Sequence, residues 1–201
     1  MKGSKLLLLL FLFITISCFS QNLRDSVIVD NGLFKVLYSE TLEEPLRVEY
    51  KVLCPDGSAS RSGMYFYTVP GIKTSDDKDY FDNEWDKGHM APAASFSCSK
   101  EMMYKTFTYV NSALQNQNLN RGVWKYLEIY ERELAKKYTV NVVIIIEFKG
   151  VLNRVPSGAA IPTGFFKMIS YNNIKECFFF QNYIPRYSSF KEYKCDCKNI
   201  K

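Results

Sequence analysis

Hydrophobic and charged residues alternate strictly along residues 46–52, where four apolar side chains are separated by three charged ones. A period of two predicts a strand with one buried and one solvated face. The stretch PDGSASRSG that follows predicts a turn, and residues 64–69 are expected to form the next strand.

The spacing of apolar residues changes after Gly122. They recur at intervals of three and four, at Val123, Leu127, Tyr130 and Leu134. This spacing predicts an amphipathic helix that runs to about Lys137, with Asn120 at its N-terminus.

Three more apolar segments follow this helix. YTVNVVIIIEF is rich in β-branched residues and predicts a strand buried on both faces. GFFKMISY, residues 164–171, and CFFFQNY, residues 177–183, predict two further strands. Together these segments indicate an α+β fold built around a largely antiparallel central sheet.

The N-terminus has a different pattern, in which two lysines precede an unbroken apolar run over residues 6–16. This is the layout of a secretory signal peptide, and the run is short for a membrane span. We expect residues 1–20 to be removed by cleavage after Ser20, which leaves residues 21–201 as a single domain that is secreted or periplasmic. The alternative is a lipoprotein anchored at Cys18, although Thr15 is a poor match to the aliphatic residue of such signals.

Charge and cysteine content narrow the choice of partner and compartment. The net charge of +5 falls to +3 when the two signal lysines are subtracted, which tolerates a polyanionic partner without requiring one. Five cysteines follow the predicted signal, in a compartment where disulfides persist, and their pairing does not follow from their spacing. A Cys/His zinc site is not expected, because the chain has one histidine.

That histidine, His89, lies in the stretch DKGHMAPAASF. Gly88 allows close approach of the backbone, Lys87 places a cation beside the ring, and Asp86 can orient a loop by hydrogen bonds. A neutral imidazole among cations suits a general base that takes a proton from water beside an anionic substrate. The alternative is a hydrogen-bonded structural histidine.

Six carboxylates lie between Asp76 and Asp86. A calcium loop is one interpretation, but the central glycine of an EF-hand loop is missing. We therefore expect a solvated loop.

A second polar group lies on the predicted helix. If the helix begins near Asn120, then Asn120, Trp124 and Glu128 lie at i, i+4 and i+8 and share one face. Eight residues separate the ends by ~12 Å, so one side chain would bind an ion directly and the other through water. Mg²⁺ retains its waters in this way. The alternative is a helix-capping asparagine, with the glutamate in an ordinary contact with Arg132. Trp124 is expected in the core under either interpretation.

The same stretches resemble a known family. DKGHMAPAASF resembles the Asp-Arg-Gly-His signature of the DNA/RNA non-specific endonucleases, which are ββα-metal nucleases. NSALQNQNLNRGVWKYLE resembles their Asn-x-x-Pro-Gln-x-x-x-x-Asn-x-x-x-Trp-x-x-Leu-Glu segment, and IPTGFFKMI is similar to their Ile-Pro-x-x-(aromatic)-(aromatic)-Lys strand. The resemblance extends from about residue 46 to residue 181. It implies a ββα-metal active-site motif on the antiparallel sheet.

The resemblance also implies roles for individual residues. His89 takes the place of the family's general base, and Asn120 takes the place of the one side chain that binds the divalent ion, with Mg²⁺ expected and Mn²⁺ also accepted. Glu128 corresponds to the carboxylate that orients the waters of the ion. The expected reaction is hydrolysis of DNA and RNA to 5′-phosphate products, without base-specific contacts.

Three basic residues are the candidates for binding the substrate phosphate. Lys87 occupies the position of the family's arginine, and Arg61 is the candidate for an upstream arginine that contacts phosphate; both are also counted among the catalytic residues. Arg121, beside the expected metal ligand, is a third substrate-binding candidate. Lysine in place of arginine exchanges a bidentate fork for a point charge, which changes activity or substrate choice.

Two further departures from the family pattern concern Leu114, in place of the usual proline, and the C-terminus. The chain ends at Lys201, without the C-terminal helix and strand of many relatives, and a disulfide from Cys195 or Cys197 is expected to hold this shortened end.

Two alternatives to an active nuclease remain: a catalytically weakened nucleic-acid-binding relative, and an envelope lipoprotein that serves as an interaction module. The sequence leaves open the oligomeric state and whether an inhibitor protein binds.

Overall fold

The computed structural model describes residues 23–199, so the predicted signal peptide lies outside the described residues. In the described part of the chain, seven strands form one sheet in the order β1-β2-β3-β6-β7-β8-β9, and every neighbouring pair is antiparallel. The strands are β1 Val27–Asp30, β2 Phe34–Ser39, β3 Glu44–Lys51, β6 Asn141–Glu147, β7 Gly164–Tyr171, β8 Ile174–Gln181 and β9 Lys194–Cys195. The predicted α+β class with an antiparallel central sheet is confirmed.

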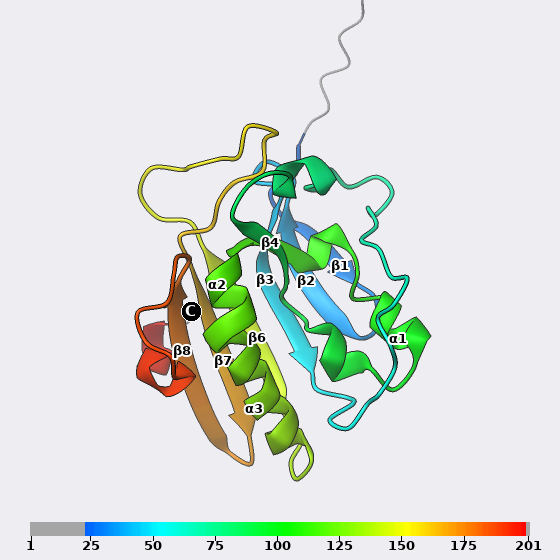
Figure 1. Cartoon of the computed structure of the whole chain (residues 1–201), viewed down its shortest axis with the longest axis vertical. Coiled ribbons are helices and arrows are strands. Elements are labelled where there is room, and N and C mark those ends of the chain that lie inside the picture. The colour runs from blue at the N-terminus through cyan, green and yellow to red at the C-terminus, as the bar shows by residue number, and fades with distance from the viewer. Residues whose placement is uncertain (1–22, 200–201) are drawn as a thin grey trace, which may run out of the picture.

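A second sheet of two strands, β4 and β5, leads directly into the main helices, which lie on one face of the large sheet (Figure 1). These elements are β4 Trp85–His89, β5 Ser112–Asn116, α1 Lys100–Tyr104, α2 Gln117–Leu119 and α3 Lys125–Ala135. Short 3-10 helices occupy Asp77–Tyr80, Ala93–Phe96, Tyr109–Asn111, Phe190–Tyr193 and Cys197–Asn199. Strands β4 and β5 with the helices after them form a ββα unit.

The helical stretch after β5 differs from its prediction at both ends and in the middle. It begins at Gln117, after a capping asparagine, and ends at Ala135. Between α2 and α3 the backbone makes a π-helical turn over Asn120–Trp124, in which Gly122 takes the non-helical angles φ −101° and ψ −117°. The prediction of Asn120 as the helix N-terminus is therefore wrong, because the helix starts one turn earlier and is distorted at the glycine.

The predicted strand at residues 64–69 is also wrong. Its one backbone bridge joins Tyr67 to Thr108, beside a turn. The ring of Phe66 packs against Phe107 and His89, with centroid distances of 5.4 and 4.8 Å. The aromatic residues of this segment thus pack around the histidine, and the segment does not extend a sheet.

The remaining strand predictions hold with changes at their ends or faces. β3 contains most of the predicted strand 46–52, β7 spans residues 164–171 as predicted, and β8 begins three residues before the predicted 177. β6 is buried on one face only, since its residues alternate between buried and half-buried. The reason is that the helices cover a single face of the sheet (Figure 1).

Two disulfides join Cys54 to Cys98 and Cys177 to Cys197, and Cys195 is unpaired among the described cysteines. The second bond ties the last described turn to β8, as expected for one of the two candidate cysteines.

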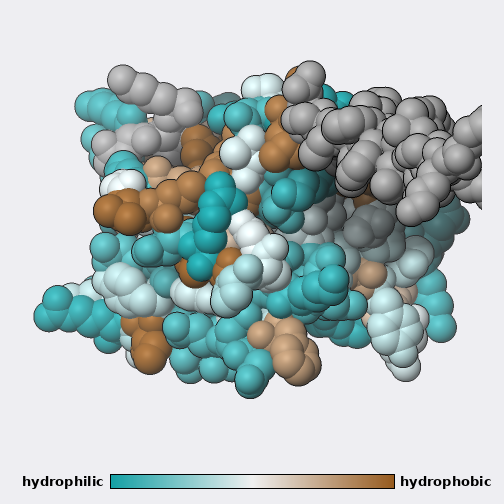
Figure 2. Space-filling view, turned by 90° about the horizontal axis from the view of Figure 1, so that it is seen from above, coloured by the Kyte–Doolittle hydropathy of each residue, from teal (hydrophilic) through white to brown (hydrophobic). Residues whose placement is uncertain are grey.

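Seen from above, the surface is mostly hydrophilic, with hydrophobic atoms in separate groups (Figure 2). Within residues 23–199, no helix combines the length and apolar character of a membrane span.

Candidate active site

All six residues that the sequence singled out for the site line one pocket of about 370 Å³. Its lining residues are Arg61, Lys87, His89, Pro92, Ala93, Ala94, Asn120, Arg121, Lys125, Glu128 and Arg132. They come from β4, the π-helical turn, α3 and the loops before and after β4. The ββα unit therefore assembles the pocket from residues more than 60 positions apart.

The pairing of β4 with β5 explains why a glycine precedes the histidine. His89 lies opposite Ser112, and Asp86 lies opposite Gln115. A Cβ atom on Gly88 would lie 2.6 Å from the Cβ atom of Gln115 and 2.4 Å from its Oε1. Glycine is thus required there because the glutamine side chain fills the space above the backbone of β4.

His89 stands between two phenyl rings at the pocket wall. The ring centroids of Phe66 and Phe107 each lie 4.8 Å from that of the imidazole. Burial, together with the nearby charge of Arg61, lowers the pKa of His89 to about 3, so the ring is neutral at pH 7. Its Nε2 atom is buried without a hydrogen-bond partner among the described residues. We therefore infer that Nδ1 is the nitrogen that would meet a water in the pocket.

Asn120 is oriented by the carboxylate of Asp86. The Asn120 Nδ2 atom donates to Asp86 Oδ2 at 2.9 Å, and Arg121 donates to the same carboxylate through Nε at 2.9 Å and Nη2 at 2.6 Å. Because Asp86 holds the amide nitrogen of Asn120, the amide oxygen points away from that carboxylate. Asp86 thus orients a predicted metal ligand, where the sequence indicated only a loop-orienting role.

Glu128 lies half-buried in the first turn of α3. Burial raises the pKa of this carboxyl to about 7, while the charge of Lys167 opposes the rise. Among the described ion pairs none joins Glu128 to Arg132, so the alternative of an ordinary helix contact between them is not supported. The carboxyl group faces the pocket that Asn120 also lines.

A buried ion pair fixes α3 against the sheet beneath these residues. The Lys167 ammonium of β7 donates to Glu131 Oε1 at 2.7 Å, and both side chains are fully buried. Tyr50 of β3 donates to Glu131 Oε2 at 2.6 Å. The same ammonium lies 4.0 Å from the ring centroid of Trp124, which is fully buried, as the core interpretation of that residue expected.

The oxygen atoms of the pocket fit a divalent ion that keeps most of its waters. Asn120 offers one amide oxygen and Glu128 one carboxylate, both of the hard type that Mg²⁺ prefers. Within the described chain, no cluster of three or more His, Cys, Asp or Glu side chains is arranged to enclose a metal.

Lys87 is the predicted residue whose surroundings differ most from expectation. Although its side chain lines the pocket, its ammonium donates to Asp77 Oδ1 and lies within 5.6 Å of the centroids of three aromatic rings. Arg121 is engaged in a similar way by Asp86. Two of the three predicted phosphate contacts are thus already paired with carboxylates.

Arg132 and Lys125 are pocket residues that the sequence interpretation did not assign to the substrate. The Nη1 atom of Arg132 is buried without a partner among the described residues, which is costly for a cation and indicates a group poised for an anion. Its position four residues after Glu128 was a usable signal, because it continues the same helix face. Lys125, by contrast, carries no motif that distinguishes it.

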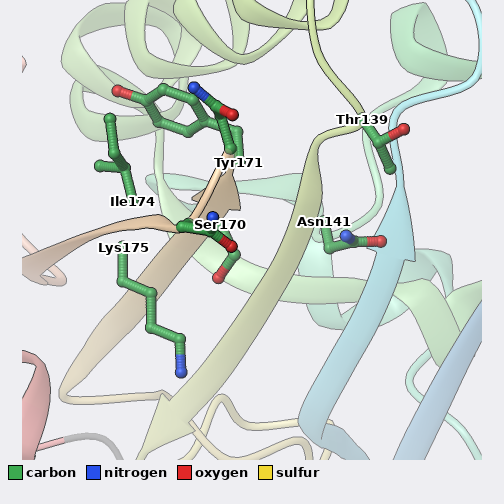
Figure 3. A pocket seen from close by; sticks show the side chains of 8 residues that line it. Thr139, Asn141, Ser170, Tyr171, Ile174 and Lys175 are labelled. Atoms are coloured by element: carbon green, nitrogen blue, oxygen red, sulfur yellow. The ribbon is translucent and has the colours of Figure 1, made fainter.

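A second hollow, of about 520 Å³, lies where β6 begins and β7 turns into β8 (Figure 3). It is lined by Thr139, Asn141, Ser170, Tyr171, Asn172, Asn173, Ile174 and Lys175. Its lining holds no histidine and no carboxylate. It therefore lacks the imidazole and the carboxylate that line the pocket around His89.

Comparison with known proteins agrees with this geometry. The family model for DNA/RNA non-specific endonucleases matches residues 15–201, and the chain therefore belongs to this family. The family predicted from the motifs is confirmed.

Individual relatives match a shorter stretch. The chain is 38% identical over 86 residues to the mitochondrial nuclease EXOG of Danio rerio, covering 41% of this chain and 25% of that protein. It is 34% identical over 109 residues to the mitochondrial nuclease of Saccharomyces cerevisiae, covering 46% of this chain and 32% of that one. The match therefore spans a quarter to a third of these relatives.

A crystal structure of an EndoG/EndoGI complex, solved to explain EndoG inhibition, contains a chain with the same fold. The TM-score is 0.78 at 21% identity, and the match covers 86% of this chain and 81% of the other. At that identity the similarity establishes the fold, and it confirms the predicted class.

Proposed function

We propose that this chain is a metal-dependent endonuclease that hydrolyses phosphodiester bonds of DNA and RNA and leaves 5′ phosphates. The observation that carries the proposal is that a neutral histidine, His89, shares one pocket with the amide oxygen of Asn120 and with unpaired cationic groups. Binding nucleic acid requires only the cations. A neutral base beside them is what activation of water requires.

His89 acts as the general base in this proposal. Its Nδ1 atom takes the proton of the attacking water, and because the ring is neutral at pH 7 this nitrogen has a free lone pair for that proton. Arg61 and Arg132 bind the phosphate from the rim of the same pocket. Because these contacts are to phosphate, base sequence and sugar type are expected to matter little.

Asn120 and Glu128 would hold the divalent ion, Asn120 directly and Glu128 through waters. When bound, the ion supplies positive charge that stabilises the negative charge developing on the phosphate. Mg²⁺ is the ion we propose, and Mn²⁺ also accepts an oxygen-rich hydrated site. Asp86 keeps the oxygen of Asn120 turned away from its own carboxylate.

The first test uses purified residues 21–201 with plasmid DNA and with RNA, in Mg²⁺ or in chelator. The wild type should degrade both in Mg²⁺ only, and His89→Ala should lose about 10²-fold or more in rate while still binding DNA. Equal rates for the two proteins would refute the general-base role. DNA binding without degradation by either would favour the nucleic-acid-binding alternative.

We also propose that the mature protein is secreted or periplasmic. The signal-like N-terminus supports this, as do two disulfides in the described part of the chain, because disulfides persist in oxidising compartments. Mass spectrometry of the mature N-terminus tests the proposal: a start at Gln21 supports it, and a lipid on Cys18 would indicate the envelope lipoprotein.

The EndoG/EndoGI complex supports the further proposal that a protein inhibitor of this chain exists.

A further inference from the structure

The ammonium group of Lys87 is held outside the centre of the catalytic pocket. It donates to Asp77 Oδ1 and lies 5.5, 5.6 and 5.5 Å from the ring centroids of Phe66, Tyr80 and Tyr109. Aromatic faces attract a cation at such distances. The rings and the carboxylate together hold this cation in one place, and its side chain is only 27% exposed.

A third hollow, of about 410 Å³, lies on the side of Lys87 toward which the ammonium points. Its lining includes Phe66, Asp77, Lys78 and Tyr109, whereas Lys87 itself lines the catalytic pocket. Three of the four groups around the ammonium thus belong to the neighbouring hollow. Lys87 thus lines the catalytic pocket, while its ammonium is paired with Asp77, which lines the neighbouring hollow.

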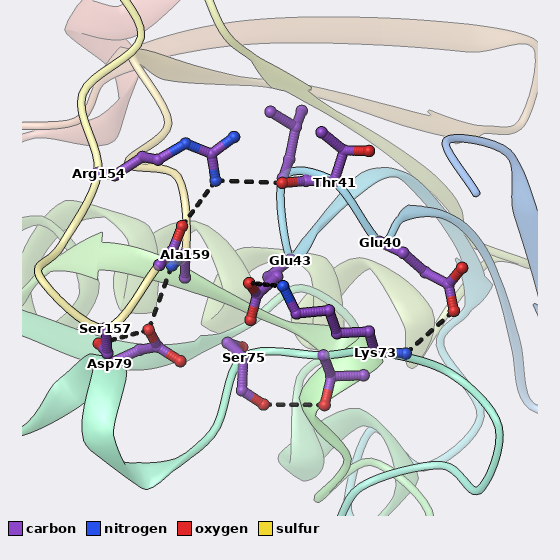
Figure 4. A network of polar contacts seen from close by, with 12 residues as sticks. Glu40, Thr41, Glu43, Lys73, Ser75, Asp79, Arg154, Ser157 and Ala159 are labelled. Carbon is purple, nitrogen blue, oxygen red and sulfur yellow. Dashed lines mark hydrogen bonds and ion pairs between the residues drawn. The ribbon is translucent and has the colours of Figure 1, made fainter. Parts of the chain in front are cut away.

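The position of Asp77 is fixed by its neighbour in the 3-10 helix Asp77–Tyr80. Asp79 is 2% exposed, and its carboxylate accepts from the backbone N–H of Asp76 at 2.8 Å, from Ser157 Oγ at 2.6 Å and from the Ala159 N–H at 3.2 Å. Figure 4 shows Asp79 bonded to Ser157 and Ala159 from the distant loop. The short helix is therefore anchored, and its exposed Asp77 carboxylate stands at a defined place.

The Asp77 carboxylate is also kept charged. Tyr109 donates to its Oδ1 atom at 2.6 Å, and the hydrogen bonds from Lys87 and Tyr109 lower the pKa of Asp77. The carboxylate side chain is nevertheless 81% exposed, so the pair can be opened by a competing anion in water. A phosphate that binds Lys87 has to displace this carboxylate.

We propose that Asp77 is an affinity-determining residue that competes with the substrate phosphate for Lys87. This inference rests on the proposed function and names a regulator of the same site. Asp77 does not touch the reacting atoms. It weakens the hold of the enzyme on nucleic acid next to the catalytic pocket, and it does so through Lys87.

The test compares Asp77→Asn with Asp82→Asn in cleavage of a DNA duplex at low salt. Asp82 is exposed, lies in the same loop and has a backbone φ of 51°, which asparagine tolerates, so it gives the same change in net charge. Asp77→Asn should lower KM by up to about fivefold, the range an exposed ion pair can carry, with kcat within about twofold. It should also steepen the dependence of log affinity on log salt by about 0.9, the value of one added phosphate contact.

A double-mutant cycle tests whether Asp77→Asn changes KM through Lys87. On a Lys87→Met background, Asp77→Asn should change KM no more than Asp82→Asn does. A persistent effect there, equal effects of the two asparagine variants, or a higher KM for Asp77→Asn would each overturn the inference. Thermal unfolding of each variant reports whether the fold is retained.

Affinity for a labelled duplex in chelator separates this inference from the proposed function. If the wild type binds DNA but does not cleave it, the proposed hydrolysis fails, while tighter binding by Asp77→Asn still supports the role of Asp77. If the wild type cleaves DNA and Asp77→Asn binds like Asp82→Asn, the inference alone fails. If the wild type binds no nucleic acid, both fail.

Discussion

The side-chain nitrogen of Asn120 donates a 2.9 Å hydrogen bond to Asp86 Oδ2, from the π-helical turn to strand β4. An asparagine amide can rotate to present either end, and this bond selects the orientation in which the oxygen is free. The two halves of the ββα unit are thereby joined at the proposed ion-binding residue.

Replacing Asp86 by alanine should weaken ion binding at Asn120. The amide would lose its orienting partner, and changes of this kind cost roughly 10–100-fold in metal affinity or activity. The measurement is the Mg²⁺ concentration for half-maximal cleavage. Arg121→Ala is the matched control, because it removes the other partner of the same carboxylate and leaves the Asn120 bond in place. A larger shift for the control than for Asp86→Ala would contradict the orienting role.

The low pKa of His89 makes stability depend on pH. The unfolded chain takes up the histidine proton near pH 6.5, and the folded chain does so only near pH 3. Between these values the unfolded state binds more protons, so the stabilising effect is complete above about pH 6.5 and declines as the pH falls toward 3. The decline is at most about 1.4 kcal/mol per pH unit, or roughly 2 kcal/mol between pH 6.5 and 5.

Urea unfolding of the wild type and of His89→Gln at pH 7.5 and pH 5 measures this effect. Glutamine does not titrate, and all other groups are shared, so the difference between the two proteins isolates the histidine. The wild type should lose more stability than the variant at pH 5. Parallel losses would show that His89 is protonated in the folded state.

The buried pair of Lys167 and Glu131 should be sensitive to loss of one partner. Lys167→Met leaves the Glu131 carboxylate buried without its cation, which typically costs about 3–5 kcal/mol. Lys149→Met is the control, since its pair with Glu147 is largely exposed on the lysine side and should matter by less than about 1 kcal/mol. Denaturant unfolding measures both. Similar small losses would mean that the buried pair does not hold α3 to the sheet.

The two disulfides should differ in their contribution to stability. The bond between Cys54 and Cys98 closes 44 residues, and its removal should cost about 4 kcal/mol in the chain-entropy account. The bond between Cys177 and Cys197 closes 20 residues and should contribute about 3 kcal/mol. Unfolding of the two serine double variants tests this order, and the reverse order would show that local packing outweighs loop closure.

Much of the site could be predicted because it is encoded locally. His89 and Gly88 are neighbours on one strand, and the spacing of Asn120 and Glu128 places both on the pocket. The helical geometry used to relate those two residues was nevertheless wrong in detail, because Gly122 introduces a π-helical turn. Their common pocket survives this change, since both residues follow β5 on the same side of the sheet.

The surroundings of Lys87 could not be predicted because they depend on contacts far apart in sequence. Its partner Asp77 is placed by Asp79, which is bonded to Ser157, 78 positions away. The predicted strand at residues 64–69 failed for a related reason: a short run rich in aromatic residues looks the same in the sequence whether its side chains face a neighbouring strand or, like Phe66, the ring of His89.

The disulfide between Cys177 and Cys197 ties the C-terminal segment to β8 at the outer edge of the large sheet. Strand β9 pairs with β8 through Cys177 opposite Cys195 and Phe178 opposite Lys194, so it covers the backbone of an otherwise terminal strand. A two-residue strand has few hydrogen bonds of its own to hold it there. In a reducing environment only the aromatic packing of Phe190 and Tyr193 and the ion pair between Lys194 and Glu176 would keep this segment on β8, so we expect the exposed edge to pair more readily with strands of other chains.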